Sequence, residues 1–176
     1  MVRTGTSRLW QSHLEKISTE RKPVFDPSKI KSVKNFEVFQ YWDKMRGDRL
    51  MPARADLDPA DLRHLLPHIL IHEVQLEPLD FRYRLIGSEV VRHLNDNHTG
   101  AWVSSIPHQK KPSKLWAILE KAVTDRAPVI ANPPYIGPYE QFKSIEDIVL
   151  PLSVDGEKVN MLFICVDFLK DKKKLN

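Results

Sequence analysis

Polar and apolar side chains alternate with a period of two over residues 81–86, and this pattern predicts a β-strand with one buried side. On that basis the two sides of the strand are Phe81, Tyr83 and Leu85, and Arg82, Arg84 and Ile86. The apolar segment 69–76 predicts a second strand. The short turn at Pro78-Leu79-Asp80 joins the two as an antiparallel hairpin. Because Phe81, Tyr83 and Leu85 are all apolar or aromatic, we expect both arginines to point outward.

Other segments carry the spacing of amphipathic helices. Residues 6–20 place Leu9, Trp10, Leu14 and Ile17 near one side, 34–46 bury several aromatic side chains before Gly47, and 113–125 follow a capping Ser113. Asp58-Pro59 predicts the start of a short helix that buries Leu62, Leu65 and Leu66 and ends at Pro67. Residues 89–94 predict one further helical turn.

The remaining strands are expected near the end of the chain. Residues 129–136 are broken by Pro133-Pro134, which predicts an edge strand. Segments 145–153 and 158–168 predict a hairpin across Asp155-Gly156. The predicted fold class is therefore α+β: a five-stranded antiparallel sheet with short helices on one face, preceded by N-terminal helices.

The net charge of +4 is distributed unevenly along the 176 residues. Residues 1–33 carry seven Lys and Arg against three Asp and Glu, and residues 168–176 carry four Lys against one Asp, which leaves the central part acidic. We expect three parts: an N-terminal helix and linker at 1–33, a domain at 34–168 and a basic tail at 169–176. The basic arms are interpreted as solvated tails, and nucleic-acid binding is not favoured.

The sequence indicates a cytoplasmic protein. Cys165 is the single cysteine and lies in an apolar strand, which excludes an intramolecular disulfide framework and fits a reducing compartment. Apolar runs such as 161–166 are too short to span a membrane, and charged residues interrupt the N-terminal segment where a signal peptide would be apolar.

No pattern of residues predicts catalysis or a metal site. His64, His68 and His72 recur every four residues, but Pro67 interrupts the helix that would stack them as metal ligands. His93 and His98 raise the same question without an obvious axial position for a haem. Glu146-Asp147 and Asp96 adjoin turn or cap signals, where acidic residues have structural roles, and no nucleophile elbow or phosphate loop occurs. We therefore predict that the protein is not an enzyme.

A series of short motifs runs through residues 36–168 in a characteristic order. They are Tyr41-Trp42, Arg46-Gly47, Arg49, the run 52–59 (PARADLDP), Leu65-Leu66-Pro67, the run 81–88 (FRYRLIGS), Thr99-Gly100 and Leu150-Pro151-Leu152-Ser153. With these motifs the sequence resembles a PAS domain, and more narrowly a small bacterial PAS-like family. The resemblance implies a sensor fold in which the sheet and short helices enclose a small-molecule pocket. It implies no catalytic residues.

For that pocket we predict a set of residues expected to point inward from the strands and short helices. The set is Leu70, Tyr83, Leu85, Val91, Leu94, Trp102, Leu119, Ile148 and Phe163. Tyr83 and Trp102 combine apolar contact with one hydrogen bond each. The alternative is that all of these side chains simply fill the core.

The leading functional hypothesis is a stand-alone sensory or regulatory domain that binds a small molecule or a protein partner in signal transduction. The apolar stripe at 6–20 favours a homodimer through the N-terminal helices. The runner-up is a ligand-free interaction adaptor, and a small hydrolase or isomerase on a cupped sheet is less favoured. The sequence does not identify a cofactor.

Overall fold

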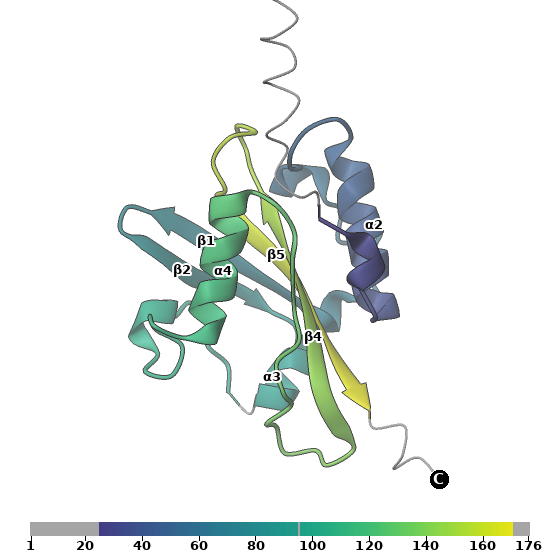
Figure 1. The fold of residues 1–176 in the computed structure, drawn as a ribbon, viewed down its shortest axis with the longest axis vertical. Coiled ribbons are helices and arrows are strands. Elements are labelled where there is room, and N and C mark those ends of the chain that lie inside the picture. The colour runs from purple at the N-terminus through teal and green to yellow at the C-terminus, as the bar shows by residue number, and fades with distance from the viewer. Residues whose placement is uncertain (1–24, 95, 171–176) are drawn as a thin grey trace, which may run out of the picture.

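A five-stranded antiparallel sheet with strand order β2-β1-β5-β4-β3 forms the centre of the computed structural model, which describes residues 25–94 and 96–170 (Figure 1). The strands are β1 (Ile69–Leu76), β2 (Leu79–Ile86), β3 (Val129–Ala131), β4 (Phe142–Leu152) and β5 (Met161–Lys170). The helices are α2 (Val33–Arg46), α3 (Ser88–Leu94) and α4 (Lys114–Asp125), with short 3₁₀ turns η1 (Pro27–Lys29), η2 (Arg54–Asp56), η3 (Leu66–His68) and η4 (Val103–Ser105). This arrangement confirms the predicted α+β class. The expected helix at 6–20 lies outside the described residues.

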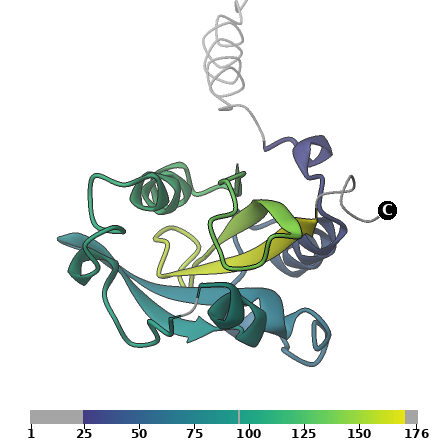
Figure 2. The ribbon, with the colours of Figure 1, turned by 90° about the horizontal axis from the view of Figure 1, so that it is seen from below.

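Helices cover both faces of the sheet (Figure 2). On one face, α4 packs against β3 and β4, and its Trp116 meets Phe81 of β2 edge to face at 5.2 Å between ring centroids. We call this the inner face. On the other, outer face, α2 packs against β4 and β5, and the Trp42 indole N–H donates to the Pro151 carbonyl at 3.0 Å. The sheet is therefore the middle layer between two apolar cores.

Burial on both faces explains why β5 reads as an almost unbroken apolar run. Its residues 162–168 are all buried. Cys165 points to the outer face and is fully buried, so it is a core thiol as the sequence suggested. In the part of the chain that the structure describes, no helix has the length and apolar character needed to cross a membrane.

A β-bulge interrupts the alternation predicted for 81–86. His72 pairs with Tyr83 and Ile71 with Leu85, so Arg84 has no partner in β1. A bulge of this kind places one extra residue on one strand and re-aims the side chains beyond it. Leu85 consequently lies on the outer face, and the prediction that it shares a side with Tyr83 is wrong. The outward direction of the arginines is confirmed, since Arg82 and Arg84 lie 3.8 and 3.7 Å from the carboxylate of Glu73.

Capping residues fix the ends of the longer helices. The Ser32 hydroxyl accepts from the Asn35 amide at the start of α2, and the Ser113 hydroxyl accepts from the Trp116 amide at the start of α4. Gly47 ends α2 with a positive φ of 56°. Ser113 and Gly47 agree with the sequence expectation, whereas the cap at Ser32 was not predicted.

Two local predictions need correction. Residues after Asp58 form successive turns rather than one helix, and Pro67 lies inside η3 instead of ending a helix. Leu62 and Leu65 are buried as expected, but Leu66 is exposed at the outer groove, contrary to the prediction. Strands β4 and β5 pair as far as Leu152 with Met161, so residues 153–160 form a longer loop than a two-residue turn. Asp155 organises this loop by accepting from the backbone amides of Glu157 and Lys158.

Gly87 marks a close approach between two backbone segments, which predicts the effect of one substitution. A Cβ added there would clash with the Pro67 carbonyl group, and the Gly87 amide already donates to the Ile69 carbonyl at 2.7 Å. We expect Gly87→Ala to lower the free energy of unfolding by about 2 kcal/mol, because backbone rather than a flexible side chain must move. Urea unfolding measures this change. The neighbouring exposed substitution Ser88→Ala is the control, and an equal effect of both would contradict the explanation.

Candidate functional site

A pocket of about 410 Å³ opens on the inner side of the sheet, between α3, the loop that leads to α4 and the loop before β4. We call it the inner pocket. Its lining residues are His93, Leu94, Asp96, His98, His108, Gln109, Tyr135, Ile136, Gly137, Pro138, Ile145 and Phe168. Its volume lies within the range of natural small-molecule sites.

Aromatic rings form one wall of the inner pocket. The His93 imidazole of α3 stacks on Phe168 of β5 with centroids 3.7 Å apart, and it is only 4% exposed. Its Nδ1 lies 2.9 Å from the Tyr135 hydroxyl, and Tyr135 in turn contacts Phe168 edge to face. Burial lowers the pKa of His93, which favours the neutral imidazole.

Gln109 links this pocket to the interior of the inner face. The Tyr83 hydroxyl donates to the Gln109 side-chain oxygen at 2.9 Å, and burial raises the pKa of Tyr83 to about 12. The Tyr83 ring also lies 4.3 Å from the His72 ring, between centroids. A chain of polar side chains thus runs from the pocket wall into the core.

His72 is an unusual occupant of that core. It is 1% exposed, and neither ring nitrogen has a hydrogen-bond partner. Burial lowers the pKa of His72 to about 3, so the ring is neutral and keeps one N–H donor and one bare acceptor. Buried polar groups are normally hydrogen-bonded, and one without a partner calls for a functional explanation.

Asp147 is a second polar group on the inner face without a partner. It pairs with Val166 in the sheet, two residues beyond the pocket-lining Ile145 and on the same side of β4. Its Oδ1 is buried and has no hydrogen-bond partner, although the residue as a whole is only partly buried. Burial, together with the charge of Glu146, raises the pKa of Asp147 to about 7. Asp147 is not itself among the residues that line the inner pocket, but it lies next to Ile145 on the same face of β4.

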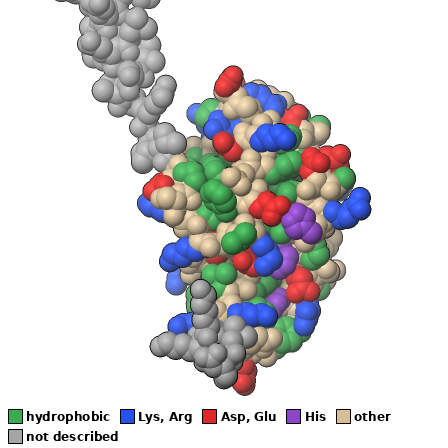
Figure 3. All heavy atoms as spheres, turned by 90° about the vertical axis from the view of Figure 1, so that its right-hand side faces the viewer, with side chains coloured by type: hydrophobic (Ala, Val, Ile, Leu, Met, Phe, Trp, Pro, Cys, Tyr) green, Lys and Arg blue, Asp and Glu red, His purple; other side chains and the backbone are tan. Residues whose placement is uncertain are grey.

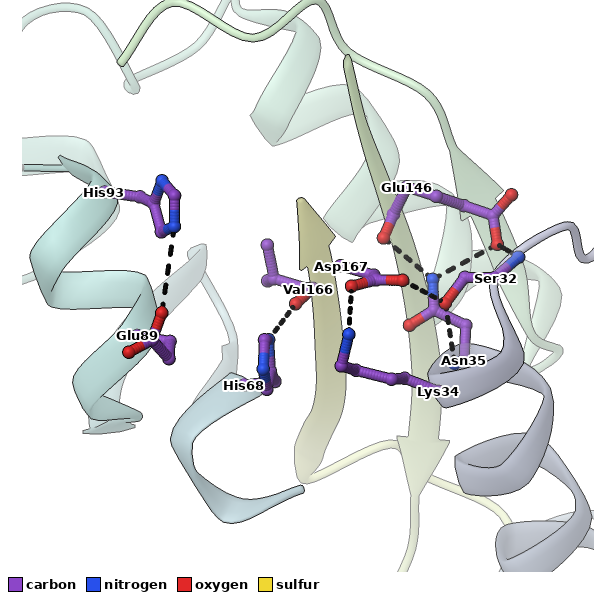
Figure 4. Close-up of polar contacts among 9 residues, drawn as sticks. All are labelled: Ser32, Lys34, Asn35, His68, Glu89, His93, Glu146, Val166 and Asp167. Atoms are coloured by element: carbon purple, nitrogen blue, oxygen red, sulfur yellow. Dashed lines mark hydrogen bonds and ion pairs between the residues drawn. The ribbon is translucent and has the colours of Figure 1, made fainter. Parts of the chain in front are cut away.

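The neighbouring residue, Glu146, points to the outer face and holds the chain that leads into α2 (Figure 4). It is fully buried, and its carboxylate accepts from the backbone amides of Lys31 and Ser32 at 3.0 and 2.9 Å. The Asn35 side chain donates to the Glu146 carbonyl at 2.7 Å. Asp167 of β5 completes the arrangement by accepting from the Ser32 hydroxyl at 2.7 Å and from the Lys34 ammonium at 2.8 Å.

A second hollow, the outer groove, lies on the outer face beside α2 and has a volume of about 430 Å³. Its lining is mainly apolar and includes Leu62, Leu66, Ile71, Leu85 and Phe163. Leu85 is 42% exposed there. On the face seen from the right of Figure 1, acidic, basic and apolar side chains are interspersed, and neither charge forms a continuous patch (Figure 3).

The predicted pocket residues separate into two groups. On the inner side, Leu94 lines the inner pocket, Tyr83 reaches it through Gln109, and Leu70 and Leu119 are buried in the inner core. On the outer face, Leu85 and Phe163 line the outer groove and Ile148 is fully buried. Trp102 stacks near the Arg82 guanidinium at 6.0 Å, and Val91 is half-buried on α3. The structure therefore does not bring the nine residues into one cavity.

Sequence reasoning missed Gln109 and Tyr135, and it assigned Asp147 to a turn. The signal for Asp147 was present: an acidic residue at the centre of an apolar strand, with Ile145 and Val149 on the same side. His64, His68 and His72 diverge as expected, since His64 pairs with Glu37 on the surface and the His68 ring meets the Val166 carbonyl. Among the described residues, no group of three His, Cys, Asp or Glu side chains is arranged to hold a metal ion.

The fold defines an α+β domain whose antiparallel sheet is covered on both faces and has a pocket beneath its short helices. A family model described as PAS domain matches residues 30–165, which is more than half of the chain. The chain therefore belongs to the PAS domain family, whose members are sensory or interaction modules and generally not enzymes. No curated protein and no solved structure matches the chain.

Proposed function

We propose that the chain is a sensory domain that binds a small organic molecule in the inner pocket and passes the signal on to a protein partner. The observation that carries this proposal is that buried polar groups without partners gather on the face where the pocket opens, namely His72, Asp147 and the Trp116 indole N–H. Leaving a buried polar group unsatisfied costs about 1–3 kcal/mol, and a ligand that hydrogen-bonds to Asp147 would remove that cost at this residue. Stability alone would favour apolar residues at the positions of His72 and Asp147.

The transmitting path we propose leads to the N-terminus. Glu146 adjoins Asp147 in β4 and fixes Lys31 and Ser32, which precede α2. A ligand that displaces β4 thus changes the geometry at the point where the N-terminal segment joins the domain. Cytoplasmic location remains part of this proposal.

Native mass spectrometry of the chain purified from its own host tests the ligand. We expect one small molecule bound per chain, and its loss from an Ile145→Trp variant, because the indole would fill the floor of the inner pocket. Leu85→Trp is the matched control, since it adds the same side chain to the outer groove and should retain the ligand. Loss of the ligand only in Leu85→Trp would mean that the ligand binds in the outer groove. A wild-type chain without a bound molecule would contradict the proposed ligand binding.

The runner-up is a ligand-free adaptor, and the exposed apolar lining of the outer groove favours it. With or without a ligand, we propose that the chain pairs with a second copy of itself through the N-terminal segment. Sedimentation equilibrium should give a dimer for the full chain and a monomer after deletion of residues 1–24. The deletion must stop there, because Phe25 packs on Phe39 at 5.1 Å and Lys31 is bound by Glu146. A monomeric full chain, or a dimer that survives the deletion, would contradict this proposal.

A further inference from the structure

We infer that the inner pocket takes an organic cation, an amine attached to an apolar or aromatic body, with its ammonium group directed toward Asp147. This inference rests on the proposed ligand-binding function and names the chemical class of the ligand. It is carried by the charges around the pocket, the rings of its wall and the unpartnered Asp147 carboxyl beside Ile145 on the same face of β4.

The charges around the pocket favour a cation. None of its described lining residues is Lys or Arg, whereas Asp96 lies at its mouth and Asp147 lies beyond its floor. The nearest guanidinium of α3, on Arg92, is occupied by Glu89 at 3.4 Å and by the Tyr139 ring at 5.1 Å. The wall histidine, His93, is biased toward its neutral form by burial. A carboxylate ligand would therefore find no fixed positive partner in the described lining.

The rings of the wall suit the same class of ligand. Tyr135 and Phe168 line the pocket, and aromatic faces attract ammonium groups by about 0.5–2 kcal/mol, most strongly where water is excluded. The floor residue Ile145 and the neighbouring Leu94 supply apolar surface for the body of the ligand. An amphiphilic amine fits both properties.

Asp147 gives the ammonium group its specific partner. Its Oδ1 is buried without a donor, and the residue lies in the sheet row directly beyond the Ile145 and Phe168 pair that forms the floor. A bound ammonium supplies the missing donor and the opposite charge together. Charge-assisted hydrogen bonds of this kind are about twice as strong as neutral ones.

Three probes of the same shape test the inference: benzylamine, benzyl alcohol and benzoate. Each is titrated into the purified full chain, and its dissociation constant is followed by the chemical-shift changes of the Ile145 and Gln109 amides. We expect benzylamine to bind at least about tenfold more tightly than benzyl alcohol, and benzoate more weakly than either, because only the amine pairs with a carboxylate.

The variant Asp147→Asn is the decisive comparison. It should bring benzylamine to within about twofold of benzyl alcohol, while Glu157→Gln, an exposed substitution outside the pocket lining, should leave the preference in place. Equal binding of amine and alcohol to the wild-type chain, a preference that survives in Asp147→Asn, or no shift with any probe would each overturn the inference. The proposed function is judged separately by the mass of the ligand from the host, so the two can fail independently.

Discussion

Replacing Asp147 with asparagine is expected to make the protein more stable above pH 7, with little change near pH 4. In the folded protein the pKa of this carboxyl is raised to about 7 from an ordinary value of 3.8, mainly by burial. Between these two values the folded state keeps a proton that the unfolded state has lost, so the free energy of unfolding falls as pH rises. The variant lacks this penalty. Its excess stability over the wild type should grow by about 4 kcal/mol between pH 4 and pH 8.

In the wild type, His72 should partly offset the fall in unfolding free energy that Asp147 causes as pH rises. Its pKa falls from 6.5 to about 3 on folding, so protonation of the unfolded state opposes folding at low pH and stability rises as pH increases over that range. The two groups act in opposite directions between about pH 4 and pH 6.5. Wild-type stability should be nearly flat there, whereas Asp147→Asn should rise steadily with pH.

Urea unfolding at a series of pH values measures both curves, with Asp96→Asn as the control for an exposed carboxyl. That control should follow the wild type within about 0.5 kcal/mol. Parallel curves for Asp147→Asn and wild type would show that burial does not raise the pKa of Asp147, and would contradict this prediction.

The substitution Glu146→Gln is expected to lower the free energy of unfolding by about 3 kcal/mol. The buried carboxylate accepts hydrogen bonds from several N–H groups through two oxygens, whereas the Gln side chain has only one acceptor oxygen. The amides of Lys31 and Ser32 both donate to the carboxylate, and a Gln side chain of the same shape satisfies only one of its oxygen positions. Part of this loss should be local to the start of α2.

Chemical denaturation measures the total effect, and amide hydrogen exchange at Lys31 and Ser32 measures the local one. The exposed substitution Glu157→Gln removes the same charge from a loop and should change stability by less than about 0.5 kcal/mol. Unchanged exchange at Lys31 and Ser32 in Glu146→Gln would mean that the carboxylate does not hold the N-terminal segment.

Much of the fold could be predicted because local signals agree with it. The caps at Ser113 and Gly47, the period of two in β2 and the prolines that leave β3 at an edge each act over a few residues. The short motifs supplied the resemblance to PAS domains, but the order of the strands in the sheet was not predicted, because periodicity does not contain it. The family match over residues 30–165 confirms that resemblance.

The candidate site was harder to predict because it depends on register. A single bulge at Arg84 moved Leu85 to the outer face. Because side chains alternate along a strand, one extra residue reverses the side on which each later residue lies. Ile148 and Phe163 were assigned inward, yet both face outward, because β4 and β5 are apolar on both sides and their periodicity is uninformative. Loop residues such as Gln109 and Tyr135 carry no periodic signal.

Because side chains alternate along β4, two neighbouring residues reach opposite faces of the sheet. Asp147 points to the pocket side and Glu146 to the N-terminal side, and a single peptide bond joins them. A displacement of this stretch of β4 moves both carboxylates at once, so in the proposed function sensing and output share one short segment of strand. No relay of side chains through the core is required between a molecule on one face and the chain that leaves from the other.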